Sequence, residues 1–169
     1  QDFSKKKELL IVNPAPIKGG YICAQIVDWL LLNAPSIPVK IVEGRSSWQD
    51  VVSDYEKTIK GGNRDWTNVT VIPVTKNIWD EFETARILFA PSLWFESGSR
   101  LMAESSLSGT PAIVSDRGGN AEMIGKGGTV VSFPEELHEP PYLSLLDATG
   151  LEQIGKLILQ YFEDDQFYA

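Results

Sequence analysis

The apolar residues of this chain gather in short runs, and longer stretches with helical periodicity separate these runs. The runs are nearly continuous rather than alternating, which is typical of strands that are covered on both faces of a sheet. The strands predicted in this way are Leu9–Val12, Val39–Val42, Val69–Val74, Ile87–Ala90, Ala112–Ser115 and Thr129–Phe133.

Helical patterns lie between these strands and after the last of them. The predicted helices are Tyr21–Leu32, Trp48–Thr58, Ile78–Thr84, Arg100–Leu107, Ala121–Ile124 and Leu151–Phe162. This alternation predicts an α/β fold, a Rossmann-like doubly wound parallel sheet of about six strands with helices on both faces. In such sheets ligands bind beyond the carboxyl ends of the strands, so the segments that follow the strands are the place to seek a site.

The length of 169 residues suits one domain, which we expect to span residues 1–169. Its strand–helix core is expected at about 8–133. Residues 134–150 are acidic and rich in proline and predict a surface loop, which leads to a terminal helix over 151–165. Gly61-Gly62-Asn63 predicts a turn before the third strand.

Composition narrows the possible partners. No apolar run approaches the roughly 20 residues needed to span a bilayer, and the start of the chain lacks a signal-peptide pattern. The formal net charge of −8 disfavours nucleic acid as a partner, although a small phosphorylated ligand needs only a few local donors. The single cysteine, Cys23, lies in an apolar run and predicts a buried side chain. These features predict a cytoplasmic setting.

A glycine pair follows the first predicted strand. Gly19 and Gly20 open a helix, where backbone N–H groups and the helix dipole favour an anion, and Lys18 adds a full positive charge. The segment is neither a phosphate-binding Walker loop nor the dinucleotide pattern Gly-x-Gly-x-x-Gly. A surface lysine beside a turn is the alternative interpretation.

Two glutamates follow the fourth predicted strand. Glu96 precedes the helix that carries Glu104, and Gly98 and Ser99 are expected to present free N–H groups at the start of that helix. Carboxylates accept paired sugar hydroxyls, so the two could border one elongated ligand. Alternatively, Glu96 favours the helix dipole and Glu104 is solvated.

A second glycine pair follows the fifth predicted strand. Gly118 and Gly119 are expected to allow close backbone approach to a ligand, and Asp116 and Glu122 to serve the start of the next helix. Neither an Asp-x-Asp motif nor a histidine cluster is present in the sequence, so a metal is not expected; the one histidine, His138, predicts a solvated or packing role.

At this point the motifs resemble a known family. The segments Phe89–Glu96, Arg100–Glu104 and Gly109–Gly125 are similar to the carboxy-terminal, donor-binding domain of the retaining GT-B glycosyltransferases of family 4, also called group 1. The hallmark of that family is Glu-x7-Glu, which Glu96 and Glu104 match. The resemblance runs from about Leu9 to Phe133.

The resemblance implies a role for each matching residue. Glu104 would bind the ribose hydroxyls of a nucleotide, Glu96 the donor sugar, and Lys18 the diphosphate. The other positions that would contact the donor are Ser97, Gly98 and Ser99 through their backbone, Asn13 and Gly19 in the diphosphate loop, Val74 beside the base, and Arg45 on the rim. The chain departs from the family at Asn13, where an arginine is usual, and at Gly98-Ser99, where the family usually has Phe-Gly.

The implied function is transfer of a hexose-type sugar from a nucleotide sugar to an acceptor with retention, without a metal or other cofactor. The implied partner is an amino-terminal acceptor domain, which this chain is too short to include and which could attach the protein peripherally to a membrane. Two alternatives stay open: a nucleotide-sugar epimerase or hydrolase of the same fold, and a non-catalytic binding module with a decayed donor site. A nicotinamide-dependent enzyme is disfavoured, because no Gly-x-Gly-x-x-Gly follows the first strand.

Overall fold

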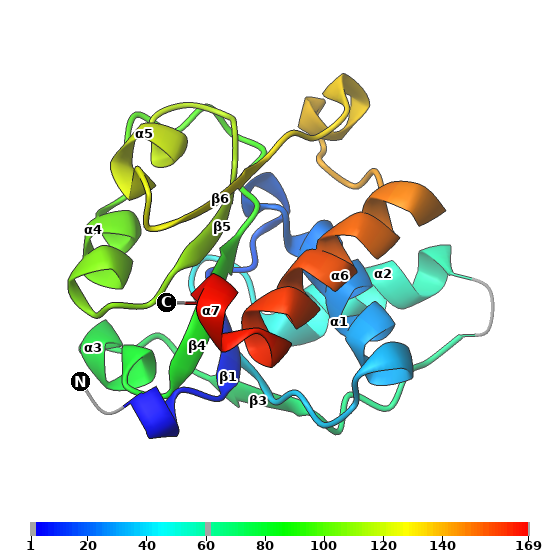
Figure 1. The fold of residues 1–169 in the computed structure, drawn as a ribbon. Coiled ribbons are helices and arrows are strands. Elements are labelled where there is room, and N and C mark those ends of the chain that lie inside the picture. The colour runs from blue at the N-terminus through cyan, green and yellow to red at the C-terminus, as the bar shows by residue number, and fades with distance from the viewer. Residues whose placement is uncertain (1–2, 60–61, 169) are drawn as a thin grey trace.

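A six-stranded sheet forms the centre of the molecule (Figure 1). The computed structural model describes residues 3–59 and 62–168. All neighbouring strands are parallel, and their order is β3-β2-β1-β4-β5-β6. The strands are β1 (Glu8–Val12), β2 (Val39–Val42), β3 (Val69–Ile72), β4 (Ala85–Ala90), β5 (Ala112–Ser115) and β6 (Gly128–Val131).

Helices cover both faces of this sheet, and Figure 1 shows them in two groups. The helices of one face are α1 (Gly20–Asn33), α2 (Trp48–Thr58) and α6 (Ala148–Glu163), with α7 (Asp165–Tyr168) following α6. The helices of the other face are α3 (Ile78–Phe82), α4 (Arg100–Leu107) and α5 (Asn120–Ile124). Short 3-10 helices occupy Phe3–Lys5, Pro16–Lys18 and Glu135–His138. The predicted fold class is confirmed.

The two cores explain why the inner strands β1, β4 and β5 are nearly continuous apolar runs. Successive residues of a strand point to opposite faces. Leu9 and Ile11 therefore pack with the first group of helices, whereas Leu10 between them packs with the second group. A strand that is buried on both sides cannot alternate between apolar and polar residues.

Several elements differ in length from their prediction. β3 ends at Ile72 because Pro73 has no N–H to donate to the ladder. α6 begins before the predicted Leu151, because the Asp147 carboxylate accepts a hydrogen bond of 2.7 Å from the N–H of Gly150 and caps the helix there. The predicted turn at Gly61-Gly62-Asn63 begins outside the described residues.

Among the described residues, no helix is both long enough and apolar enough to cross a membrane.

The packing of α6 on α1 leads to a prediction for the effect of Gly155→Ala on stability. A Cβ built on Gly155 would lie 2.6 Å from Cε3 of the Trp29 ring, well inside contact distance. Helix propensity alone would make Gly155→Ala stabilising by about 1 kcal/mol. Overpacking a core costs about 1–3 kcal/mol, so we expect Gly155→Ala to lower the free energy of unfolding measured by urea denaturation.

The double variant Trp29→Ala/Gly155→Ala is the control. Without the ring the atoms nearest to the added methyl group are gone, so the second substitution should become neutral or stabilising relative to Trp29→Ala alone. An increase in stability on Gly155→Ala in the wild-type background would contradict this packing.

Candidate functional site

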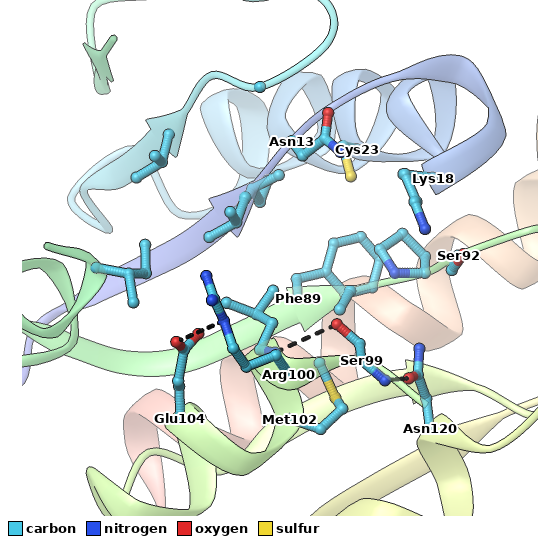
Figure 2. A pocket seen from close by; sticks show the side chains of 18 of the residues that line it. Asn13, Lys18, Cys23, Phe89, Ser92, Ser99, Arg100, Met102, Glu104 and Asn120 are labelled. Carbon is cyan, nitrogen blue, oxygen red and sulfur yellow. Dashed lines mark hydrogen bonds and ion pairs between the residues drawn. The ribbon is translucent and has the colours of Figure 1, made fainter. Parts of the chain in front are cut away.

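A cavity of about 700 Å³ opens at the carboxyl ends of β1 and β4 (Figure 2). The residues around it come from the ends of β1, β2 and β4, from the segments that follow the first four strands, from α1, α3 and α4, and from Asn120. β1 and β4 are neighbours, yet the chain proceeds from β1 toward β2 and from β4 toward β5, in opposite directions along the sheet. This is the switch point at which ligands bind in doubly wound sheets, and the volume lies within the range of small-molecule sites.

The loops that follow β1 and β4 are bonded to each other. The N–H groups of Leu93 and Trp94 both donate to the carbonyl of Ile17, at 3.1 and 3.2 Å. Gly19 has a φ of +81°, and a Cβ there would lie 2.3 Å from the carbonyl oxygen of Pro91. The glycine is therefore needed for contact between the two loops.

The N–H groups of the first glycine pair are used inside the chain. Gly19 donates to the carbonyl of Pro16 at 2.9 Å, and Gly20 donates to the carbonyl of Ala15 at 3.1 Å. The expectation that these groups face an anion is wrong for the structure described here, and Gly19 does not line the cavity.

The contact between the two loops brings Lys18 and Glu96 together. Their side chains form an ion pair between Lys18 Nζ and Glu96 Oε1, and they are 29% and 16% exposed. The hydroxyl of Ser92 donates to the same carboxylate oxygen at 3.0 Å. Burial lowers the pKa of Lys18, and the guanidinium of Arg45 lowers it further by repulsion. The cation expected to hold a diphosphate and the carboxylate expected to hold a sugar thus meet at one point.

Glu104 lines the same cavity from α4. Its carboxylate is 13% exposed and forms an ion pair of 3.1 Å with Nε of Arg100, one helical turn earlier, whose side chain is 89% exposed. Glu96 lies before α4, which begins at Arg100. The two glutamates are therefore brought to one cavity by the loop and by the helix, not by a shared helical face.

The segment before α4 is only partly directed at the cavity. Ser99 lines it, whereas Ser97 and Gly98 are exposed outside its lining. The N–H of Ser99 donates to the side-chain oxygen of Asn120 at 3.1 Å, and its hydroxyl accepts a hydrogen bond from the N–H of Leu101. The expectation of a free N–H at Ser99 is therefore wrong.

The second glycine pair holds Glu96 in place. Gly118 forms an isolated parallel bridge with Glu96, and a Cβ on Gly118 would lie 2.1 Å from the Glu96 carbonyl oxygen. The N–H of Gly119 donates to the same carbonyl at 2.6 Å. The close approach predicted for these glycines is made to the backbone of Glu96 rather than to a ligand.

Three other predicted residues lie around the cavity. Asn13 has a φ of +56°, and its side-chain oxygen accepts a hydrogen bond of 3.0 Å from the backbone N–H of Arg45. Asn13 therefore joins the segments that follow β1 and β2. Val74 lines the cavity after β3 and is 69% exposed, so an apolar surface is open to a ligand there.

Several residues of the site were not assigned to it from the sequence, among them the polar residues Ser92, Arg100 and Asn120. The Arg100–Glu104 pair could have been found from its spacing of four residues on a helix. The contacts of Ser92 with Glu96 and of Asn120 with Ser99 depend on how loops fold, and no local sequence pattern predicts them.

The single cysteine and the single histidine are both buried. Burial raises the pKa of the Cys23 thiol, which suits the packing role expected for it. The ring Nδ1 of His138 lies 3.1 Å from the carbonyl oxygen of Leu93, so the histidine supports the loop after β4.

The charge of the cavity differs from that of the whole chain. The net charge is −8, but Lys18, Arg45 and Arg100 face three glutamates around the cavity. One of these, Glu43, already accepts a hydrogen bond from the N–H of Trp48. Over the part of the chain that is described, no three His, Cys, Asp or Glu side chains are grouped so that they could hold a metal ion.

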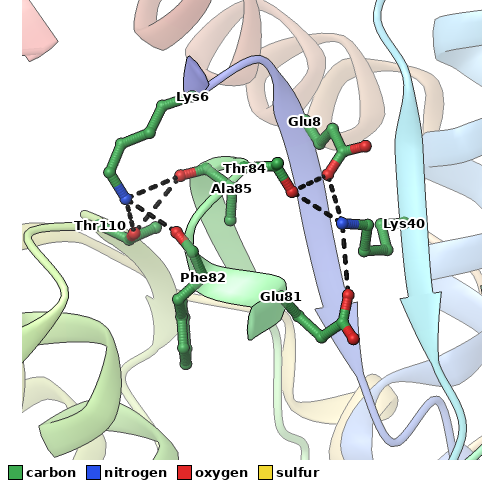
Figure 3. Close-up of polar contacts among 8 residues, drawn as sticks. All are labelled: Lys6, Glu8, Lys40, Glu81, Phe82, Thr84, Ala85 and Thr110. Atoms are coloured by element: carbon green, nitrogen blue, oxygen red, sulfur yellow. Dashed lines mark hydrogen bonds and ion pairs between the residues drawn. The ribbon is translucent and has the colours of Figure 1, made fainter. Parts of the chain in front are cut away.

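The amino ends of the same strands are joined by charged side chains (Figure 3). The buried Nζ of Lys6 donates to the carbonyl of Phe82 at 2.9 Å and to the hydroxyl of Thr110 at 2.7 Å. Burial lowers the pKa of Lys6. Lys40 pairs with Glu8 at 2.7 Å. These contacts fix the register of the strands at the end opposite to the cavity.

Comparison with known proteins connects this site to a family. The model of the family described as "Glycosyl transferases group 1" matches residues 59–139. Spore coat protein SA of Bacillus subtilis (strain 168) is 24% identical over 160 residues, which cover 90% of this chain and 42% of that protein. The family match confirms the resemblance to group 1 glycosyltransferases over residues 59–139.

Solved structures confirm the fold. The GtfA/B complex matches with a TM-score of 0.68 at 15% identity, over 96% of this chain and 30% of that one. An α,α-trehalose 6-phosphate synthase from Burkholderia multivorans matches with a TM-score of 0.64 at 13% identity, over 98% of this chain and 36% of that one. The chain thus spans less than half the length of each of these proteins.

The repulsion between Arg45 and Lys18 leads to a prediction for the pKa of Lys18. Replacing Arg45 by Ala removes a repulsive cation, while the burial of the lysine remains. We expect Arg45→Ala to raise the pKa of Lys18. An NMR titration of the lysine side-chain carbon and nitrogen resonances measures this pKa.

Arg117→Ala is the matched control, because Arg117 pairs with Glu135 outside the cavity lining. It should leave the titration of Lys18 unchanged. A Lys18 pKa that does not move, or falls, in Arg45→Ala would show that the two cations do not share one site.

Proposed function

We propose that this chain is the donor-binding domain of a retaining glycosyltransferase that transfers a hexose-type sugar from a nucleotide diphosphate sugar to an acceptor. The observation that carries the proposal is one cavity lined by Lys18, Glu96 and Glu104. A cation suits a diphosphate, and two carboxylates suit the hydroxyls of a ribose and of a sugar. The match to group 1 glycosyltransferases supports the same function.

The arrangement of these side chains suggests how a donor lies. Figure 2 shows Glu104 and Lys18 toward opposite ends of the cavity, with Ser99 between them. A ribose at Glu104 would direct its diphosphate toward Lys18, and the sugar would follow at Glu96. The base would then lie on the exposed apolar surface at Val74.

The Lys18–Glu96 pair gives the site a resting state. Burial makes an unpaired lysine unfavourable, so the lysine keeps a carboxylate partner when no donor is bound. A diphosphate offers more negative charge and more acceptor oxygens than one carboxylate. On binding, Lys18 would exchange Glu96 for the diphosphate, and Glu96 would become available to the sugar hydroxyls.

The reaction that we propose needs no protein nucleophile. The bond between the anomeric carbon and the phosphate oxygen breaks, and a bond to the acceptor oxygen forms on the same face of the sugar. The proton of the acceptor hydroxyl passes to the departing phosphate oxygen. The protein then has to stabilise the charge that develops on the diphosphate and to hold the sugar still, which are the roles of Lys18 and Glu96.

The acceptor would be held by a second, amino-terminal domain. Support comes from coverage, because this chain spans 30% and 36% of the two solved structures. We expect this chain alone to bind donor weakly and to transfer little or no sugar. A cytoplasmic setting, with any contact to a membrane made through the acceptor domain, belongs to the same proposal.

Nucleotide binding tests the proposal. We expect at least one of UDP, GDP and ADP to bind in isothermal titration calorimetry. Lys18→Ala and Glu104→Ala should each weaken that binding about tenfold or more, because a hydrogen bond to a charged group contributes about 1.5–3 kcal/mol. Because metal independence is part of the proposal, EDTA should leave the affinity unchanged.

Lys156→Ala and Glu152→Ala are matched controls, since these residues form an exposed pair on α6 outside the cavity lining. They should bind like the wild type. Failure of the wild type to bind any of the three nucleotides would contradict the proposal and favour a binding module with a decayed donor site. Hydrolysis or epimerisation of a nucleotide sugar by this chain would favour the other alternative.

A further inference from the structure

Asn120 is a buried polar side chain on the lining of the cavity. It is 2% exposed, it begins α5, and it lines the cavity opposite the start of α4. Its side-chain oxygen accepts the hydrogen bond from the N–H of Ser99. Neither its position at a helix start nor the family resemblance assigned it a contact with the donor.

The hydrogen bond from Ser99 fixes which way the amide of Asn120 points. A backbone N–H can only donate, so the atom of Asn120 that faces it must be the carbonyl oxygen Oδ1. The amino group Nδ2 then lies on the other branch of the side chain. Figure 2 shows this nitrogen at the end of the side chain that faces the cavity, on the side of Lys18 and Ser92.

The amino group Nδ2 of Asn120 is available to donate hydrogen bonds. Nδ2 carries two N–H bonds, and within the described residues no acceptor is bonded to it. Because Asn120 lines the cavity, a ligand oxygen there can accept a hydrogen bond from this amino group.

We propose that Nδ2 of Asn120 donates to an oxygen of the sugar-linked phosphate of the donor, an inference that rests on the proposed function. The Oδ1 atom of Asn120 accepts the hydrogen bond from the N–H of Ser99, and the Nδ2 atom presents its own N–H groups to the cavity. The hydrogen-bond donor at this position therefore comes from the start of α5 instead of the backbone before α4. The phosphate is favoured over the ribose because Asn120 lies toward Lys18, whereas Glu104 lies toward the other end of the cavity.

Asn120→Asp tests the inference with little change of shape. The aspartate keeps an oxygen for the Ser99 N–H and replaces Nδ2 by a second carboxylate oxygen, which repels phosphate. The probes are the nucleoside diphosphate that the wild type binds and the corresponding monophosphate, which lacks the sugar-linked phosphate. We expect Asn120→Asp to weaken binding of the diphosphate about ten- to a hundredfold, and of the monophosphate about threefold or less.

Glu122→Gln is the matched control, because Glu122 is an exposed residue of the same helix outside the cavity lining. It should leave both affinities unchanged. An equal loss for both nucleotides in a folded Asn120→Asp protein, or no loss for either, would overturn the inference.

A second measurement covers the case in which Asn120→Asp does not fold. In wild-type protein labelled with ¹⁵N, the side-chain amide resonances of Asn120 should shift with the diphosphate and stay nearly unchanged with the monophosphate. The same small shift with both would overturn the inference. If the wild type binds neither nucleotide, the proposed function itself fails; if it binds and Lys18→Ala loses binding while Asn120 shows no preference for the diphosphate, only the present inference fails.

Discussion

The site depends on one contact, the bonding of the loop after β1 to the loop after β4. Two consecutive N–H groups, those of Leu93 and Trp94, share the carbonyl of Ile17, and Gly19 packs directly on the carbonyl of Pro91. Neighbouring parallel strands end side by side, but the chain leaves β1 and β4 in opposite directions. This backbone contact joins the two loops and sets Lys18 against Glu96.

The glycines around the site serve the backbone rather than the ligand. Gly118 and Gly119 lie so close to Glu96 and Ser97 that a side chain at either position would collide with their carbonyl oxygens. The loop that carries Glu96 is thus held between the loop after β1 on one side and the loop after β5 on the other. Two carboxylates and one lysine are positioned accurately because the segments bearing them are fixed by main-chain contacts.

The fold could be predicted from the sequence to a large extent, because the inner strands are buried on both faces and are therefore nearly continuous apolar runs. Leu9, Leu10 and Ile11 are all apolar for that reason, and the alternation with helical patterns implies the parallel order. Local chemistry shortened β3 at Pro73 and started α6 at the Asp147 cap. The end of β3 and the start of α6 can each be predicted from a single residue, although the apolar pattern alone does not predict them.

The site could be predicted only in part. The sequence and its resemblance named Lys18, Glu96 and Glu104, and the structure places all three on one cavity. The ion pair of Lys18 with Glu96 joins residues 78 positions apart, and the amide of Asn120 reaches Ser99 over 21 positions. Such contacts are set by the way loops meet across the sheet, so no spacing in the sequence predicts them.

A crystal structure of this chain with a bound nucleoside diphosphate would show whether this cavity holds the donor. We expect the ribose hydroxyls at the Glu104 carboxylate and the Lys18 ammonium on the diphosphate, with the Lys18–Glu96 ion pair broken. A nucleotide bound elsewhere, or one bound here with that ion pair intact, would contradict it.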